Sequence, residues 1–139
     1  EAQWEYACRA GTQSVFHYGN GLGSHQANFD GNYPYGGAAR GSYKSSTVLV
    51  KSHRENAWGL YDMHGNVWEW CADGYEKDYG SNKQTDPTGA KDRQVRVLRG
   101  GCWNDNAWIC RSAFRLRDGP GIRYNSFFGF RLSLQVENQ

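Results

Sequence analysis

Four cysteines and four histidines are the side chains of this sequence that could act as nucleophiles, bases or ligands of a transition metal. They are Cys8, Cys71, Cys102, Cys110, His17, His25, His53 and His64. No Cys-x-x-Cys or Cys/His zinc pattern links them, and no spacing assembles a His/His/carboxylate iron site. Cys102 precedes Trp103, with no histidine close in the sequence that could serve as its base. The pattern of these residues therefore disfavours catalysis.

Residues 65–70 (GNVWEW) are the clearest candidate for a cation site. They predict a tight turn that leads into a short strand, with carbonyl groups between Asn66 and Glu69 that could face one side. Oxygen ligands from a turn, together with one carboxylate, suit Ca²⁺. We therefore predict Asn66, Val67 and Glu69 as ligands of a structural calcium ion. In the alternative, Asn66 closes an Asx-turn and Glu69 pairs with an arginine.

Residues 99–132 combine two kinds of residue. One is a regular frame, made of RGG, Trp103, CRSA, several arginines, Pro120 and GFR. Between the frame residues lie others without a strand or helix period, in which large apolar residues adjoin turn formers. We call these the filler residues: Asn104, Asp105, Asn106, Trp108, Ile109, Phe114, Leu116, Asp118, Gly119, Gly121, Ile122, Tyr124, Asn125, Ser126, Phe127 and Phe128. Such a mixture rarely builds a core, so we expect the filler residues and Trp103 to form a ligand-binding surface.

The elements that must position this segment are few and short. Residues 1–10 have the apolar spacing of a helix, and Gly11 is its predicted cap. The predicted strands are residues 15–18, 46–50, 95–98 and 129–134. The last of them would place Phe130, Leu132 and Leu134 on one face. Repeated glycines and polar turn formers interrupt the rest of the chain.

The composition indicates one small domain. A chain of 139 residues can bury a single core, and six Trp and nine Tyr indicate a loop-rich fold held by aromatic clusters. The net charge of +2 is too small to indicate a nucleic-acid partner, and no apolar run approaches a membrane span. The sequence opens at Glu1 in the middle of a motif, without a visible signal peptide. We expect the natural protein to have a further N-terminal portion.

Three groups of motifs resemble the formylglycine-generating-enzyme (sulfatase-modifying factor) superfamily. They are EAQWEYACRAG at residues 1–11, GLYDMHGNVWEW at residues 59–70, and the frame motifs RGG-x-W, CRSA-x-R and GFRL. Together they reach from the first residue to about residue 134. The resemblance implies a single α+β domain over residues 1–139. Its fold would be C-type-lectin-like, of the formylglycine-generating-enzyme type, and poor in regular secondary structure.

The resemblance also has implications for the cysteines and for metal. Cys8 and Cys110 match the positions of a structural disulfide, with four buried thiols as the alternative. The turn at residues 65–70 binds calcium in some family members. The enzyme's copper-binding cysteine pair is not matched, because Asp105 and Trp108 stand in its neighbourhood. A metal-dependent oxidoreductase, of the formylglycine-generating or non-haem iron type, stays open as an alternative with active residues partly outside this chain.

The frame further resembles the C-terminal repeat of the variable proteins of diversity-generating retroelements, which share this fold. In those systems, adenine replacement turns Asn codons into almost any codon except those for Trp, Met, Lys, Gln and Glu. Residues 104–128 contain no Lys, Gln, Glu or Met, whereas the other 114 residues contain 19 of them, so about four would be expected. Trp108 is the one forbidden residue, and an AGG codon reaches TGG by one adenine change.

We therefore predict a variable ligand-binding region over residues 102–131. Its ligand would be an unknown protein or cell-surface molecule, and the protein would be displayed on a cell or phage surface. The filler side chains should be mostly exposed on one contiguous face and the frame mostly buried, because core substitutions cost more than a marginal fold tolerates. Frame arginines should bind carbonyls and carboxylates: Arg111, Arg115, Arg117, Arg123 and Arg131.

Overall fold

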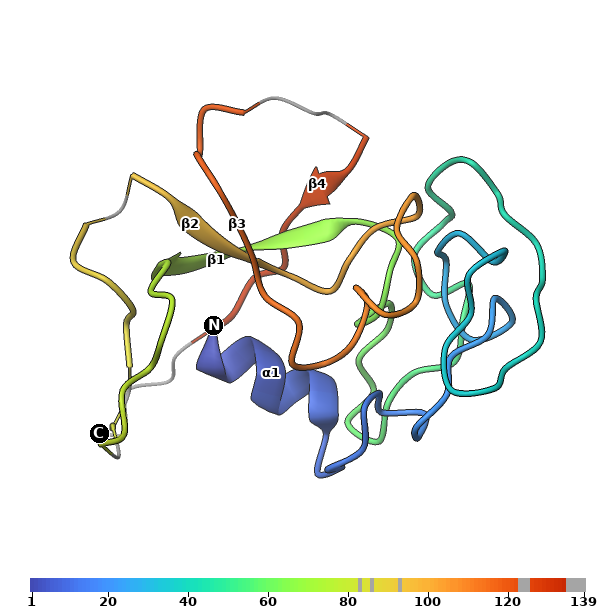
Figure 1. Cartoon of the computed structure of the whole chain (residues 1–139), viewed down its shortest axis with the longest axis horizontal. Coiled ribbons are helices and arrows are strands. Elements are labelled where there is room, and N and C mark those ends of the chain that lie inside the picture. Colours follow the sequence, from blue (N-terminus) through green and yellow to red (C-terminus); the bar gives the residue numbers. More distant parts are fainter. Residues whose placement is uncertain (83, 86, 93, 123–125, 135–139) are drawn as a thin grey trace.

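The helix predicted at the start of the chain forms α1, which spans Ala2–Arg9 (Figure 1). Its buried residues are Trp4 and Cys8, whose spacing of four places them on one side of a helix. The chain leaves the helix through Ala10, which has a φ of 45°, so the cap lies one residue before the predicted Gly11. In this computed structural model, the described residues are 1–82, 84–85, 87–92, 94–122 and 126–134. Among them, no helix is long and apolar enough to cross a bilayer.

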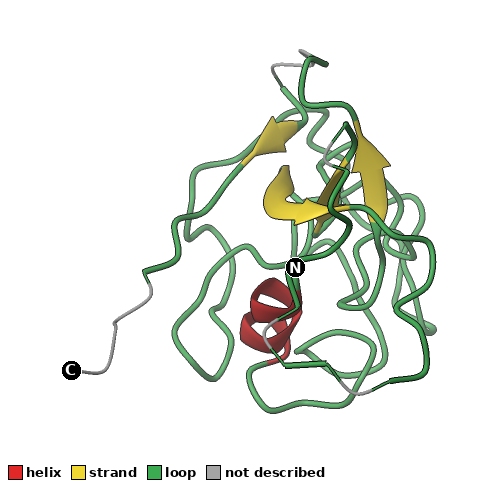
Figure 2. Ribbon diagram, turned by 90° about the vertical axis from the view of Figure 1, so that its left-hand side faces the viewer, coloured by secondary structure: helices red, strands yellow, loops and turns green. Residues whose placement is uncertain are grey.

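A four-stranded sheet gathers the second half of the chain beside α1, and most of the remaining chain is loop (Figures 1 and 2). Its strands are β1 (Trp68–Gly74), β2 (Arg96–Arg99), β3 (Leu116–Asp118) and β4 (Phe128–Gly129). The order is β3-β2-β1-β4, antiparallel except for the parallel pair of β1 and β4. Two predicted strands are therefore confirmed. One begins within residues 65–70, and the other, predicted over residues 95–98, is shifted by one residue in β2.

The other predicted strands are wrong or too long. Residues 15–18 form a single bridge from Phe16 to Gly19, and residues 46–50 form no strand. The closing strand ends at Gly129. Beyond it, the side chains of Phe130, Leu132 and Leu134 are 72%, 90% and 87% exposed. Alternating hydrophobicity finds residues able to face a core, but a strand also needs a partner, and β1 pairs with β4 over only two positions.

The buried apolar side chains form three small clusters instead of one continuous core. The first contains Phe16, Leu22, Ala27, Phe29, Ala107 and Cys110; the second contains Trp4, Cys8 and Met63; the third contains Trp68, Leu98 and Cys102. Loops with few ladder hydrogen bonds need other partners for their backbone groups. Polar side chains buried between the clusters supply them.

Arg99 is the largest of these buried polar side chains, with no exposed area. Its guanidinium donates to the carbonyl oxygens of Phe114 at 2.6 Å and Ser112 at 2.9 Å. It also forms an ion pair with Glu5 and lies 5.2 Å from the ring centroid of Trp4. A single side chain from the end of β2 thus fastens α1 to the loop that precedes β3.

His64 performs a similar role in neutral form. Its Nδ1 lies 2.8 Å from the carbonyl oxygen of Cys110, and its Nε2 lies 3.2 Å from the backbone N–H of His17. These partners require a proton on Nδ1 and a lone pair on Nε2. Burial, followed by the nearby His17, lowers the pKa of His64 to about 3. The ring therefore stays uncharged at neutral pH and acts as a structural bridge.

Gly65→Ala tests the turn before β1. Gly65 has a φ of 76°, and a methyl group there would clash with the carbonyl oxygen of Asn28. That oxygen accepts the N–H of Asn66 at 2.7 Å. Because this hydrogen bond holds the two chain segments together, neither segment can move away from the added methyl group. We expect a loss of about 2–5 kcal/mol of unfolding free energy, measured by urea denaturation. Gly59→Ala is the matched control, since φ is 75° there and the added methyl meets open space; equal losses would contradict the clash.

Candidate ligand-binding surface

The sheet provides a buried base for part of the filler segment. Trp68 of β1, Leu98 of β2 and the following Cys102 form this base. The filler residues that pack on it are Ile109, Phe114, Leu116, Phe127 and Phe128, all partly buried. They come from β3, from β4 and the residue before it, and from the loop between β2 and β3. The sheet order therefore brings filler residues from separate parts of the segment onto one support.

An open hollow of about 170 Å³ lies on this support. It is lined by Trp68, Cys102, Asn104, Asp105, Leu116, Phe127 and Phe128. The lining combines aromatic rings with an amide and a carboxyl group at one edge. Such a combination of apolar walls and a few polar groups is typical of surfaces that bind a partner's side chain.

A stack of aromatic rings adjoins the hollow through Phe127, which lines it. Trp103 stacks on Phe127 at 5.2 Å and on Tyr43 at 6.2 Å between ring centroids. The Trp103 indole N–H donates to the carbonyl oxygen of Ser126 at 2.9 Å, and the Tyr43 hydroxyl donates to Asn104 Oδ1 at 2.6 Å. Sequence analysis misses Tyr43, because it lies in a glycine-rich loop some sixty residues away with no motif around it.

A second aromatic group surrounds Trp108, which is 50% exposed. Its ring meets Phe114 edge-on at 5.1 Å, and the Arg111 guanidinium lies 4.2 Å from its centroid. Arg111 also donates through Nε to the Trp108 carbonyl oxygen at 2.7 Å. The exposed indole is therefore held in one orientation by a frame arginine, which reduces the entropy that it would lose on binding.

The predicted division between exposed filler and buried frame holds in part. No described filler residue is buried. The exposed ones are Asn104, Trp108, Gly121, Ile122 and Ser126, and the half-buried ones are Asp105, Asn106, Ile109, Phe114, Leu116, Asp118, Gly119, Phe127 and Phe128. Tyr124 and Asn125 lie outside the described residues. The frame is less uniform, since Arg99, Gly101, Cys110 and Ser112 are buried but Ala113, Arg117, Pro120 and Phe130 are exposed.

Three of the frame arginines bind backbone or carboxylate oxygens as predicted. Arg111 bonds Trp108; Arg115 forms two bonds to Glu1, at 2.6 and 2.9 Å; Arg131 bonds Glu69 through both Nε and Nη2. Arg117 instead lies over the ring of Tyr75 at 5.0 Å. Arg123 lies outside the described residues. These forked contacts fix irregular backbone where no sheet ladder is present.

Cys102 and Asp105 form a local pair beneath the hollow. The backbone N–H of Cys102 donates to Asp105 Oδ2 at 2.9 Å. Burial, followed by the Asp105 charge, raises the pKa of the Cys102 thiol to about 12. Burial also raises the pKa of Asp105. The thiol is therefore protonated at neutral pH, which makes it a poor nucleophile.

The predicted Cys8–Cys110 disulfide is wrong, since all four cysteines are free thiols. Cys8 Sγ lies 3.6 Å from Ser112 Oγ, and Cys110 Sγ lies 3.7 Å from the carbonyl oxygen of Asn106. The His64 ring contacts both residues, at 3.9 Å from Cys8 Sγ and 2.8 Å from the Cys110 carbonyl. Each thiol thus has a separate polar partner.

The oxygens proposed for calcium already have protein partners. Asn66 Oδ1 accepts from Asn28 Nδ2 at 3.1 Å and from the Val48 N–H at 3.0 Å. Both oxygens of Glu69 accept from Arg131, and one also accepts from the Trp4 indole N–H at 2.6 Å. Glu69 is thus paired with an arginine, as in the alternative. In this arrangement the set of Asn66, Val67 and Glu69 does not fit a cation, and calcium would have to displace Arg131.

No three His, Cys, Asp or Glu side chains of the described residues gather closely enough to hold a metal ion. The calcium prediction is tested by chelation, because an ion that binds only the folded state raises its thermal midpoint. Because the Asn66 and Glu69 oxygens already have protein partners, we expect EDTA to leave the midpoint unchanged. A midpoint that EDTA lowers and that added Ca²⁺ but not Mg²⁺ restores would show instead that calcium displaces Arg131. A midpoint unchanged by EDTA would leave Glu69 with its ion-pair role alone.

The sequence of this chain is similar to those of several known proteins. The family described as sulfatase-modifying factor enzyme 1-like domain matches residues 1–136. The formylglycine-generating enzyme of Mus musculus is 33% identical over 139 residues, which cover 94% of this chain and 37% of that protein. The serine/threonine-protein kinase pkn1 of Chlamydia caviae is 38% identical over 99% of this chain and 21% of its own length. The chain thus spans about a fifth to two fifths of these relatives.

Two solved structures are similar in fold. Treponema denticola variable protein 1 has a TM-score of 0.75 and 30% identity, over 93% of this chain and 44% of its own. PvdO from Pseudomonas aeruginosa has a TM-score of 0.73 and 31% identity, over 93% of this chain and 48% of its own. These similarities confirm the predicted α+β, C-type-lectin-like fold of the formylglycine-generating-enzyme type.

Proposed function

We propose that this chain, which belongs to the family of sulfatase-modifying factor enzyme 1-like domains, binds a protein ligand through the surface formed by its filler residues. The observation that carries the proposal is the burial pattern. No described filler residue is buried, although they alternate along the chain with buried frame residues such as Gly101, Cys110 and Ser112. A segment with this pattern can change its filler side chains without changing its core.

The chemistry of the surface suits protein recognition. Trp103, Trp108 and Phe127 are large rings: Trp103 stacks on Phe127 and donates to the Ser126 carbonyl oxygen, and Trp108 meets Phe114 edge-on. Asn104 and Ser126 beside them are small, exposed and polar. Rigid aromatic anchors combined with adaptable polar side chains are typical of evolved binding surfaces. The apolar hollow between them offers a place for one side chain of the ligand.

Two further observations support diversification of this surface by a retroelement. The segment lacks Lys, Gln, Glu and Met, four of the five residue types that adenine replacement in Asn codons does not produce, and the fifth type occurs once, as Trp108. In addition, the similar Treponema denticola structure is, by its name, a variable protein. We propose that the protein is displayed on a cell or phage surface, where a varying binding face meets varying ligands.

Stability measurements test the proposal through matched substitutions. Ile122→Asn, at a 39% exposed filler position, should change the unfolding free energy by less than about 0.5 kcal/mol. Ala107→Asn introduces the same side chain within the same segment, at a position with no exposed area, and should cost at least about 2 kcal/mol. Urea denaturation measures both. If the substitution at Ile122 costs as much as the substitution at Ala107, the filler positions cannot tolerate variation.

Sequencing the gene's neighbourhood tests diversification itself. A near-copy of the region that encodes residues 102–131, differing only at adenines and lying beside a reverse transcriptase gene, would support it. A locus without such a copy would limit the proposal to an undiversified binding surface.

The enzymes among its relatives make metal-dependent oxidation the second candidate. The formylglycine-generating enzyme of Mus musculus matches 94% of this chain. Because burial keeps the Cys102 thiol protonated, we expect no copper-dependent oxidation of a cysteine-containing peptide by the purified chain, as followed by mass spectrometry. Stoichiometric Cu(I) binding that is lost in Cys102→Ser would favour the oxidoreductase instead.

A further inference from the structure

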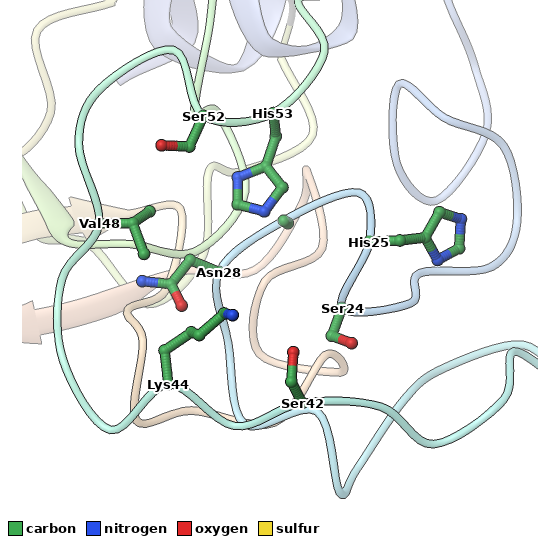
Figure 3. Close-up of a pocket in the computed structure, with 9 residues that line it drawn as sticks. Ser24, His25, Asn28, Ser42, Lys44, Val48, Ser52 and His53 are labelled. Atoms are coloured by element: carbon green, nitrogen blue, oxygen red, sulfur yellow. The ribbon is translucent and has the colours of Figure 1, made fainter.

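A second hollow, of about 420 Å³, shares no lining residue with the hollow on the filler surface (Figure 3). Residues 24–28 form one side and residues 42–53 the other. Its lining consists of Ser24, His25, Ala27, Asn28, Ser42, Lys44, Val48, Ser52 and His53. The lining has one ammonium group, two imidazoles and three hydroxyls, and it contains no carboxylate. This donor-rich character distinguishes it from the aromatic hollow.

The chain around this hollow carries a strong local positive charge. Residues 38–54 contain Arg40, Lys44, Lys51 and Arg54 but no Asp or Glu, so the formal charge of this segment is +4. The whole chain has a formal charge of only +2. The Asp62 carboxylate faces His53. It also accepts the Lys51 backbone N–H at 2.8 Å. A positive rim around a concave surface attracts anions.

Several donors of the hollow have no protein acceptor. Among the described residues, none accepts a hydrogen bond from the Ser24 hydroxyl, the Ser42 hydroxyl or the Lys44 ammonium. Figure 3 shows the Ser24 and Ser42 hydroxyls near each other, with the His53 ring pointing toward Lys44 from the opposite side. His53 Nδ1 is buried without a hydrogen bond, since Asp62 lies 3.8 Å away. Ser52 differs, because its hydroxyl donates to the Leu49 carbonyl.

The backbone holds these donors in place through two close approaches. A methyl group at Gly41 would overlap Ser24 Oγ, and one at Gly31 would overlap the Ser42 carbonyl oxygen. The Gly41 N–H also donates to the Gly31 carbonyl at 2.9 Å. The two sides of the hollow are thus packed together without side chains between them. Because the backbone that carries Ser24 and Ser42 is fixed in this way, their hydroxyls lose little entropy when they bind a ligand, whereas Lys44 is exposed.

We propose that this hollow binds a small molecule through a tetrahedral oxyanion, as in a phosphate or sulfate ester. The Lys44 ammonium would neutralise the charge, and the Ser24 and Ser42 hydroxyls would donate to separate oxygens of the group. Donors converging from different chain segments suit a tetrahedral group better than a planar carboxylate. The volume exceeds that of the anion alone, so the remaining space accommodates the organic part of the ester. The site uses no filler residue and does not depend on the proposed protein ligand.

Calorimetric titration of the full chain with inorganic phosphate, and separately with inorganic sulfate, tests the proposal at constant ionic strength in chloride. Saturable binding of at least one is expected, and the stronger of the two identifies the ester class. Lys44→Gln should weaken that binding at least about tenfold, as expected for loss of a charged hydrogen bond. Lys51→Gln is the matched control, because it removes the same charge from the same segment outside the hollow, and should weaken binding less than twofold.

Three results would overturn the site. They are the absence of saturable binding, equal weakening by the two lysine variants, and acetate binding as tightly as phosphate or sulfate. Ser42→Ala provides an independent variant that keeps the charge, and should weaken binding several-fold. Binding unchanged in Ser42→Ala would also contradict the proposed geometry. None of these substitutions changes a filler residue. A result that overturns the anion site would therefore not contradict the proposed binding of a protein ligand.

Discussion

The guanidinium of Arg99 is the contact on which the arrangement of this molecule depends. A buried charge is costly unless it is paired and hydrogen-bonded. Arg99 meets that requirement through Glu5 of α1 and through the carbonyl oxygens of Ser112 and Phe114, while its Nε faces the Glu1 carboxylate at 3.7 Å. Since these partners lie in the helix and in the loop before β3, the helix, the sheet and the frame must assemble together.

Other arginines extend the same principle toward the binding surface. Arg131 holds the end of β4 to Glu69 in β1, and Arg115 holds the start of β3 to Glu1. The backbone of the filler segment is therefore fixed by charged side chains that belong to the frame. Filler side chains pack against the third cluster of buried residues, which is Trp68, Leu98 and Cys102. No described filler residue is itself buried. This separation of support from surface is what permits an irregular segment to present a defined shape.

The glycine-rich half of the chain contributes to the filler surface and to the second hollow. Tyr43 reaches the filler surface, where it stacks on Trp103 and donates to Asn104. Its neighbours Ser42 and Lys44 line the second hollow instead. Asn66 anchors this loop by accepting from Asn28 and Val48. The turn before β1 thus has a structural role that does not require a metal, in that it positions the loop from which both surfaces draw residues.

The sequence by itself determined the elements whose signals are local: the helix at residues 1–10, the turn at 65–70, the strand at 95–98, and the motifs that indicate the family. Only the tertiary structure decided which apolar stretches find a partner. Residues 46–50 have the β-branched composition of a strand, but the Val48 N–H donates to Asn66 and forms no strand pair, and Leu132 is exposed because β4 ends after two residues. Likewise, only the tertiary structure decided that Cys8 is a free thiol and that the second hollow forms. Both depend on groups far apart in the chain, and no local pattern encodes which distant donor, ring or glycine will lie beside them.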